Sequence, residues 1–271
     1  MSSYETIIYE EKGAVAWVTL NRPEVYNAFN QQMQAELRDV WRSLRVKDEI
    51  NAVVLTGAGD KAFCTGVDRQ EAMANLGEDQ RHMFNTSNPY MFDDPGHDLG
   101  PKQSDLWKPV IAAVNGMACG GAFYLLSECD ILIAAEHATF FDPHVTYGMS
   151  AVYEPIQMLQ KMPFGEVMRI GLLGNYERMS AKRAHEVGML SDVLPAEKLL
   201  EEAEWLADAI ATQPALAVQT TLRAIWFGHE ATRLQAIAMA PSLVGCGNQK
   251  ETMEEGQALF ASGKRVAPRV R

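Results

Sequence analysis

The chain has 271 residues, 47% of them hydrophobic, and a formal net charge of −11 at pH 7. This length allows one large domain, or one domain with an extension, and the apolar content is sufficient for a core. The negative charge argues against a general nucleic-acid binder, because affinity for the phosphate backbone depends on clustered Lys and Arg.

The sequence shows no pattern typical of a signal peptide, a membrane span or a cysteine-rich motif. The N-terminal residues lack the basic and apolar segments of a signal peptide, and no run of about 18 apolar residues predicts a membrane span. The cysteines are Cys64, Cys119, Cys129 and Cys246, and none belongs to a CxxC pair or a His-rich metal spacing. We therefore predict buried, reduced thiols in a cytoplasmic protein without a metal site.

The first part of the chain alternates strands with one helix. We predict strands at 6–9, 14–20 and 52–56, a helix from Asn30 to about Val46, and a loop at 57–66. Asn30 suits an N-cap, because its side chain can accept a hydrogen bond from a free N–H of the first turn. The strand–helix–strand order predicts parallel pairing of the flanking strands.

The rest of the chain divides into an irregular segment, two further strands and a helical region. We predict strands at 110–114 and 131–135, a lid at about 76–102, and helices from Pro195 to about Ala211, from Pro214, and from Asn248 to about Ala261. Residues 1–195 would form a core, and residues 196–271 a C-terminal helical region.

The segment 110–148 carries the strongest functional signal. A β-branched strand is followed by a turn at Asn115-Gly116, and Gly120-Gly121 then opens an apolar segment of helical length. A helix that begins with glycine presents free backbone N–H groups and the positive end of its dipole, which suit a negatively charged oxygen. Alternatively, the two glycines only allow the helix to pack tightly on the strand.

Three sequence blocks together resemble the crotonase (enoyl-CoA hydratase/isomerase) superfamily. The first is the segment just described, which is similar to AAVNGxAxGGGxExxxxCD followed by FxxPE. Residues 61–68, KAFCTGVD, resemble the KAFxAGxD loop, and residues 21–30, NRPEVYNAFN, resemble NRPxxxNAL. The resemblance covers nearly the whole chain. It implies an α/β fold, a ββα-spiral core with a C-terminal helical trimerisation region, and a homotrimer or dimer of trimers.

The resemblance also implies an oxyanion hole. In the family, two backbone N–H groups hold a thioester oxygen as it becomes an enolate, and the matching residues here are Val67 and Gly121. Coenzyme A enters as part of an acyl-CoA substrate, with no permanently bound cofactor. Implied contacts with the substrate or its CoA portion come from Arg22, Val25, Tyr26, Ala28, Cys64, Gly66, Asp68, Arg69, Gln70, Gly120 and Lys264. Relatives often place a cation just after NRP, whereas this chain leaves only Arg22 nearby.

The two positions that hold glutamate in the family's hydratases hold Tyr124 and His144 here. A tyrosine with an ordinary pKa near 10 cannot replace a carboxylate base at neutral pH. His144, with an ordinary pKa near 6.5, can accept or donate a proton. In family members, the residue at the position of His144 faces the reacting carbons. Alternatively, His144 is hydrogen-bonded in the wall of the site and has no catalytic role. Hydration of the family's usual kind is therefore not expected.

Glu154 is the nearest carboxylate after His144. It lies close to a position where some related isomerases and hydrolases carry a working acid. Glu154 could act directly, orient His144, or simply favour the start of a helix through the dipole. We expect Asp142, His137 and Glu128 to be surface or turn residues.

Three functions fit these observations. The leading hypothesis is an acyl-CoA enzyme that stabilises a thioester enolate and performs isomerisation, hydrolysis or C–C cleavage, with His144, Glu154 and Tyr124 as catalytic residues. The second is a CoA-independent β-diketone hydrolase that uses His144 and Glu154. The third is a non-catalytic acyl-CoA-binding paralogue.

Overall fold

The structure is a computed structural model that describes residues 4–74, 94, 96–97, 99–263 and 266–271. Most of the predicted lid therefore lies outside the described residues, as does Lys264. Among the helices that are described, none combines the length and the apolar character needed to cross a membrane.

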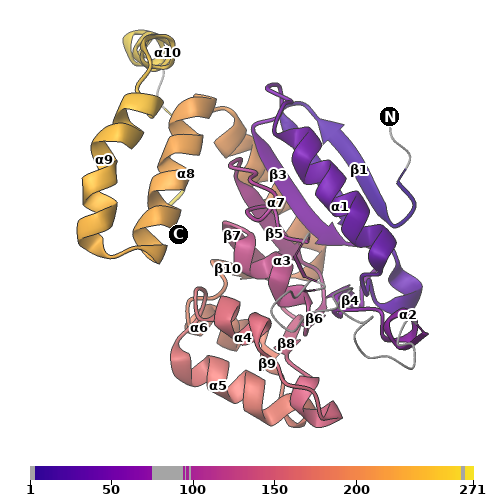
Figure 1. Cartoon of the computed structure of the whole chain (residues 1–271). Helices are drawn as coiled ribbons and strands as arrows, with labels where there is room; N and C mark the ends of the chain where they lie inside the picture. The colour runs from indigo at the N-terminus through magenta and orange to yellow at the C-terminus, as the bar shows by residue number, and fades with distance from the viewer. Residues whose placement is uncertain (1–3, 75–93, 95, 98, 264–265) are drawn as a thin grey trace.

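A six-stranded sheet forms the centre of the molecule (Figure 1). Its strands, in spatial order, are β1 (Ile7–Lys12), β2 (Val15–Leu20), β3 (Ala52–Gly57), β5 (Val110–Val114), β7 (Ile131–Ala135) and β10 (Asp192–Leu194). β1 and β2 are antiparallel, and all other neighbours are parallel. Strand β3 pairs on both sides and is buried along its whole length, which explains its continuous apolar sequence.

A smaller sheet lies beside the first and contains β4 (Ala62–Cys64), β6 (Met117–Cys119), β8 (Thr139–Phe141) and β9 (Met179–Ser180). The first three strands are parallel, and β9 is antiparallel to β8. These strands have only two or three residues each, and β4, β6 and β8 follow closely after β3, β5 and β7 of the large sheet. β4 and β6 therefore carry the chain from β3 and β5 into the loops that contain the sequence motifs.

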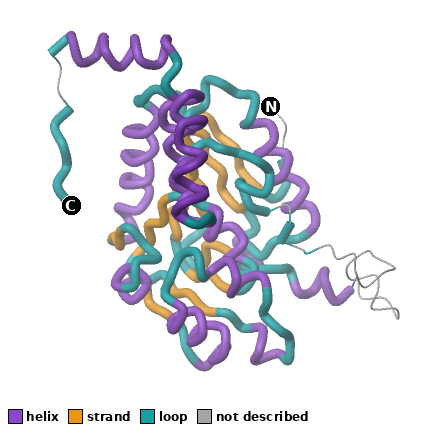
Figure 2. Tube along the Cα trace, turned by 60° about the vertical axis from the view of Figure 1, so that its left-hand side comes forward, coloured by secondary structure: helices purple, strands orange, loops and turns teal. Residues whose placement is uncertain are grey.

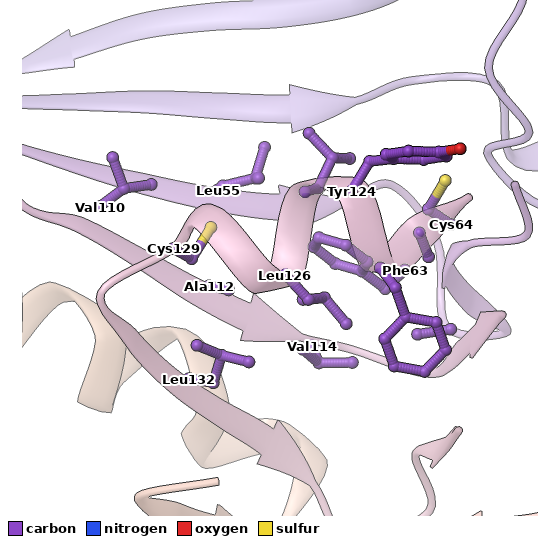
Figure 3. Packing of buried hydrophobic residues seen from close by; sticks show 14 of the residues in the cluster. Leu55, Phe63, Cys64, Val110, Ala112, Val114, Tyr124, Leu126, Cys129 and Leu132 are labelled. Carbon is purple, nitrogen blue, oxygen red and sulfur yellow. The ribbon is translucent and has the colours of Figure 1, made fainter. Parts of the chain in front are cut away.

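Helices cover both faces of the large sheet. On one face lie α1 (Gln31–Leu44) and α3 (Ala122–Glu128), and on the other α7 (Leu199–Ala211). Helix α3 is buried on almost every side, and Figure 3 shows its side chains packed among those of β3, β5 and β7. Along the chain, the segment from β8 to α7 also contains α4 (Tyr153–Met158), α5 (Phe164–Leu173), α6 (Ala181–Glu186) and the 3₁₀ turns η3 (His144–Tyr147), η4 (Gly174–Tyr176) and η5 (Ala196–Lys198). Two further short elements, η1 (Pro23–Val25) and α2 (Arg69–Ala74), lie in the motif loops.

The C-terminal helices form an arm on one side of the large sheet. Figures 1 and 2 show α8 (Ala215–Glu230) beside α9 (Arg233–Gly247), with α10 (Lys250–Ala261) beyond their ends. Trp226 of α8 attaches this arm to the core, because its indole N–H donates to Asp130 Oδ1 at 2.6 Å. Lys102 Nζ donates to the other oxygen of the same carboxylate at 2.8 Å.

Most predicted elements are confirmed, with differences at short strands and helix ends. The Asn30 side chain accepts from Met33 N at 2.9 Å, as expected for the N-cap, although α1 ends at Leu44 rather than Val46. Asn248 does not cap the last helix; it follows α9, and Gln249 is the N-cap of α10. The loop after β3 contains β4, and the region after residue 155 contains β9 and β10. The division at residues 195 and 196 stays a prediction.

The cysteine prediction is confirmed for three residues and wrong for one. Cys64, Cys119 and Cys129 are buried free thiols, and burial raises the pKa of each to about 12. Cys246 is free but exposed, because it lies on α9 in the projecting arm. The apolar residues beside Cys246 in the sequence therefore do not indicate that its side chain is buried.

Candidate active site

The three sequence blocks meet because each follows one of three neighbouring parallel strands. Residues 21–30 follow β2. Residues 61–68 follow β3 and contain β4, and residues 115–121 follow β5 and contain β6. The carboxyl ends of parallel strands share one edge of a sheet, which is where ligand sites of open α/β sheets form. The sheet topology therefore assembles a site from segments far apart in the sequence.

The contact between the Gly66 loop and the start of α3 forms the first half of the site. Gly66 has φ +84°, and a Cβ built on it would lie 2.8 Å from Gly121 N. A Cβ on Gly121 would lie 2.6 Å from a ring carbon of Phe29. Phe29 also holds the loop in place, because its N–H donates to Gly66 O at 2.8 Å and its carbonyl accepts from Asp68 N at 2.7 Å. Both glycines are needed for this close approach.

The N–H groups of Val67 and Gly121 are the backbone donors that remain at this contact. Among the described residues, neither N–H donates to a backbone or side-chain acceptor. Val67 is 40% exposed, so this residue lies at the surface of the protein. Two free donors on adjoining loops are suited to one oxygen that gains negative charge.

His144 lies next to this pair of donors. It begins η3, and a Cβ built on Gly120 would lie 3.6 Å from His144 Cε1. Asp142 orients the ring: its Oδ1 lies 2.5 Å from His144 Nδ1 and accepts from the His144 backbone N–H at 3.0 Å. This hydrogen bond raises the pKa of His144 above its ordinary value, although burial acts in the opposite direction. The other ring nitrogen, Nε2, is left for proton transfer.

Glu154 and Tyr124 complete a buried polar group around His144. Glu154 Oε1 lies 3.6 Å from His144 Nε2, and the residue is only 5% exposed. Burial raises the pKa of Glu154 and does the same for Tyr124. The Tyr124 hydroxyl donates to Asp94 Oδ2 at 3.0 Å. Figure 3 shows the hydroxyl at the far end of the ring, away from Val110 and Cys129.

Asp142, His144 and Glu154 also meet a simple proximity criterion for metal binding, with one ligand atom of each within 4.8 Å of the others. Asp142, however, contacts Nδ1 of the imidazole, whereas Glu154 faces Nε2. These two carboxylates, one hydrogen-bonded to Nδ1 and one 3.6 Å from Nε2, lie on opposite sides of the ring and are not arranged around one ion. The geometry therefore favours acid–base chemistry.

The predicted CoA-contacting residues lie around the same loops, and two of them bind each other. Arg22 Nη2 lies 2.8 Å from Asp68 Oδ2, and Arg22 Nη1 donates to Ala28 O at 2.7 Å. The guanidinium therefore joins the first two sequence blocks, and its charge is balanced by Asp68. Arg22 is therefore ion-paired within the protein, and its predicted contact with the CoA portion of a substrate stays a prediction.

The remaining predicted contacts differ in accessibility. Tyr26, Arg69 and Gln70 are exposed, and the Arg69 guanidinium lies 4.8 Å from the centre of the Tyr147 ring. Val25 is half-buried and Ala28 is buried. The Cys64 thiol lies fully inside the core, so a contact with a ligand would come from its backbone, and the predicted contact stays a prediction.

Sequence reasoning missed two carboxylates of the site. Asp142 is fully buried rather than a surface residue, and its Oδ2 has no hydrogen-bond partner among the described residues. Its position two residues before His144 is the signal that could have found it. Asp94 lies in the segment predicted as irregular, and no motif marks it. His137, by contrast, is exposed as expected.

Comparisons with known proteins show which family the chain resembles in sequence and fold. The family model described as enoyl-CoA hydratase/isomerase matches residues 10–266. The (E)-benzylidenesuccinyl-CoA hydratase of Thauera aromatica is 34% identical over 98% of both chains. The crystal structure of an enoyl-CoA hydratase/isomerase from Mycobacterium paratuberculosis has a TM-score of 0.85 and 34% identity, with 98% of both chains covered. An enoyl-CoA hydratase structure from Bacillus anthracis also gives a TM-score of 0.85, at 26% identity and with 96% and 97% of the chains covered. The chain belongs to the enoyl-CoA hydratase/isomerase family, the crotonase superfamily.

Proposed function

We propose that this protein is an acyl-CoA enzyme that forms a thioester enolate and moves protons through His144 and Glu154. The observation that carries this proposal is the His144–Glu154 pair beside the free N–H groups of Val67 and Gly121. The names of the relatives support a CoA thioester as substrate and a reaction at its α and β carbons.

The proposed chemistry begins with the thioester oxygen at the two backbone donors. A base removes a proton from the α-carbon, and the electron pair of that C–H bond moves into the carbonyl to give an enolate oxygen. The donors of Val67 and Gly121 stabilise this oxygen as its charge develops, and one such donor contributes about 3 kcal/mol. His144 Nε2 takes the proton, since Asp142 holds the opposite side of the ring.

Glu154 supplies the second proton-transfer group. After removal of the α-proton from a 3-enoyl thioester, a proton delivered to the γ-carbon moves the double bond to the 2-position. In hydration of a 2-enoyl thioester the enolate forms instead when a base takes a proton from water as the water oxygen adds to the β-carbon, and a proton delivered to the α-carbon then completes the reaction. Both outcomes need two groups that exchange protons near the same carbons. The structure supports such a pair even though Tyr124 and His144 replace the usual glutamates, with Glu154 as the carboxylate member.

Exchange of the α-hydrogen in D₂O tests the shared enolate step without assuming a final product. The enzyme is incubated with saturated, 2-enoyl and 3-enoyl acyl-CoAs, and deuterium in the recovered thioesters is measured by mass spectrometry. We expect incorporation at the α-carbon and its loss in the His144→Asn variant. A new double-bond position or a water adduct then identifies the reaction.

The other outcomes of this experiment correspond to the alternative functions. Binding of acyl-CoA in calorimetry without exchange or turnover would identify a non-catalytic binding protein. Turnover of a cyclic β-diketone without acyl-CoA binding would identify the β-diketone hydrolase. Either result would contradict the proposed enolate chemistry on CoA thioesters.

Asp142→Asn is expected to change the pH dependence of this reaction. The Asp142 carboxylate raises the pKa of His144, so its removal lowers that pKa and moves the ascending limb of the pH–rate profile to lower pH. We expect kcat to fall as well, by between about ten- and 10⁴-fold, because the developing imidazolium loses its counter-charge. The profile is measured from kcat between pH 5 and 9, with the exposed Asp48→Asn as control. An unmoved limb would show that His144 is not the titrating base.

We also propose that the chain forms a homotrimer or a dimer of trimers, as is typical of the family. Large apolar side chains remain exposed on α5 and α9, including Phe164 at 68%, Leu172 at 64% and Ile237 at 61%. Burial of such residues between subunits would explain them. Light scattering should therefore give three or six times the 30.0 kDa mass of one chain. A monomer at micromolar concentration would contradict this.

A further inference from the structure

A cavity of about 670 Å³ lies between helix α8 and the core of the protein. Two of the residues that line it mark its place on the large sheet: Pro109 directly precedes β5, and Ile131 is the first residue of β7. The cavity therefore lies at the amino ends of these strands, whereas the candidate active site lies at the carboxyl ends. Its volume falls in the range of about 300–1,000 Å³ that is typical of small-molecule sites.

The wall of this cavity is mainly apolar. Its apolar side chains come from the end of α7 and from one face of α8, and include Ile210, Val218, Leu222 and Ile225. Ile225 is 66% exposed although it belongs to the helix that attaches the arm to the core. Burial of such a side chain by an apolar ligand is favourable, because it removes apolar surface from water.

Lys161 places an ammonium group in this apolar surrounding. Its Nζ donates to the carbonyl oxygen of Cys129 at 2.7 Å and lies 4.7 Å from the centre of the Trp226 ring, and Lys161 and Trp226 both line the cavity. Among the described residues, no carboxylate forms an ion pair with Lys161. Burial lowers its pKa, as expected for a cation without a direct counter-charge. An ammonium group has three N–H donors, so two of them remain for a ligand.

The other titratable groups of the wall do not balance this charge. The carboxylate of Asp130 is occupied, because Oδ1 accepts from the Trp226 indole at 2.6 Å and Oδ2 accepts from Lys102 Nζ at 2.8 Å and from a backbone N–H at 2.7 Å. Lys102 thus neutralises Asp130. His229 contacts a backbone carbonyl oxygen through Nε2 at 3.0 Å. The wall therefore keeps the positive charge of Lys161, in a chain whose net charge is −11.

We propose that this cavity is a second ligand site, which binds a medium-chain carboxylate with its head group on Lys161 and its alkyl chain along the apolar face of α8. One ammonium group matches the single charge of a carboxylate. A phosphomonoester carries about two charges, and phosphate sites commonly use the forked guanidinium of Arg. The alkyl chain would cover Leu222 and Ile225, so the ligand would contact the core and the arm together.

Titration calorimetry of the full-length protein with octanoate and 1-octanol tests this site. The two probes have the same chain length, but only octanoate is charged. We expect one octanoate per chain, bound more tightly than 1-octanol. Lys161→Met should weaken octanoate binding by about 10- to 100-fold, the loss expected for a hydrogen bond to a charged group, and leave 1-octanol binding unchanged. The exposed Lys182→Met is the matched control and should change neither affinity.

Ala217→Phe tests the apolar part of the cavity. Ala217 lines the cavity from α8, so a phenyl ring there occupies the space of the alkyl chain, and both probes should lose binding. Ala224 lies on the same helix, is exposed and does not line the cavity, so Ala224→Phe should bind both probes like the wild type. Circular dichroism should show that all the variants remain folded.

Three results would overturn the inference. Equal octanoate affinities of the wild type and Lys161→Met would show that the ammonium group does not hold the carboxylate. Equal affinities of the wild type and Ala217→Phe would show that octanoate binds elsewhere, for example in the active site. Binding of neither probe would show that the cavity is not a ligand site, as when another subunit covers it. Activity on acyl-CoA should be unchanged in the variants, because the active site lies at the opposite edge of the sheet.

Discussion

Replacing His144 by asparagine is expected to lower kcat on acyl-CoA substrates by roughly 100- to 10,000-fold, the usual contribution of a positioned proton-transfer group. His144 lies beside Gly120, faces Glu154 at 3.6 Å and is oriented by Asp142. Asparagine can still donate to the buried Asp142 carboxylate, but it cannot take up a proton at neutral pH. The loss should therefore fall on the chemical step.

The control for this variant is His137→Asn, because His137 is an exposed histidine whose Nε2 contacts only the carbonyl oxygen of Asp60 among the described residues. Steady-state kinetics on the accepted acyl-CoA would give kcat and KM for both variants, and thermal unfolding would compare their stability. Similar KM values and unfolding temperatures are expected, with kcat reduced only in His144→Asn. Equal kcat values would exclude His144 from proton transfer.

Much of the fold and half of the site could be predicted because their determinants are local in sequence. The apolar runs that became β3, β5 and β7, and the Asn30 cap, depend on neighbouring residues. The two glycine-containing loops whose N–H groups we propose as an oxyanion hole could be predicted from sequence blocks. Helix α3 was expected from its glycine start and apolar length, although burial on nearly all sides leaves it no helical periodicity.

The remaining features depend on contacts between distant parts of the chain. Strands β6, β8 and β9 have two or three residues, too few for a pattern, and they exist because they pair with one another or with β4. Asp94 binds Tyr124 across 30 positions of sequence. Asp142 was missed for a different reason: its sequence suggests a turn, and only the fold shows that the turn is buried.

Tyr124 and His144 replace the two glutamates of the family's hydratases, and the structure shows which other carboxylates lie near them. On the sequence alone, the loss of two glutamates argues against hydration of the usual kind, and Glu154 is a candidate that could act directly, orient His144 or only favour the start of a helix. In the fold, Glu154 reaches the same group of side chains from α4, and Asp94 reaches it from the opposite side of Tyr124. Carboxylates are thus present around the candidate site, but they come from other segments of the chain.

Gly66→Ala is expected to lower kcat by roughly 100- to 1,000-fold, comparable with the loss of one oxyanion donor. The added Cβ would lie 2.8 Å from Gly121 N, directly against one of the two proposed donors. Alanine at φ +84° also strains the backbone by about 1–2 kcal/mol. Two effects therefore act together, and the experiment must separate the blocked donor from the strained loop.

Gly188→Ala provides that separation. Gly188 has φ +86°, nearly the same as Gly66, but a Cβ there meets no atom within 4 Å. Both variants carry nearly the same backbone strain, and in chemical denaturation Gly66→Ala should lose further stability because its Cβ also meets backbone atoms; only Gly66→Ala should lose kcat. If the two variants kept equal activity on acyl-CoA, the Gly121 N–H could not be an oxyanion donor. The enolate chemistry would then have to use the Val67 N–H without it, because the added methyl group occupies the space that a substrate oxygen needs beside Gly121.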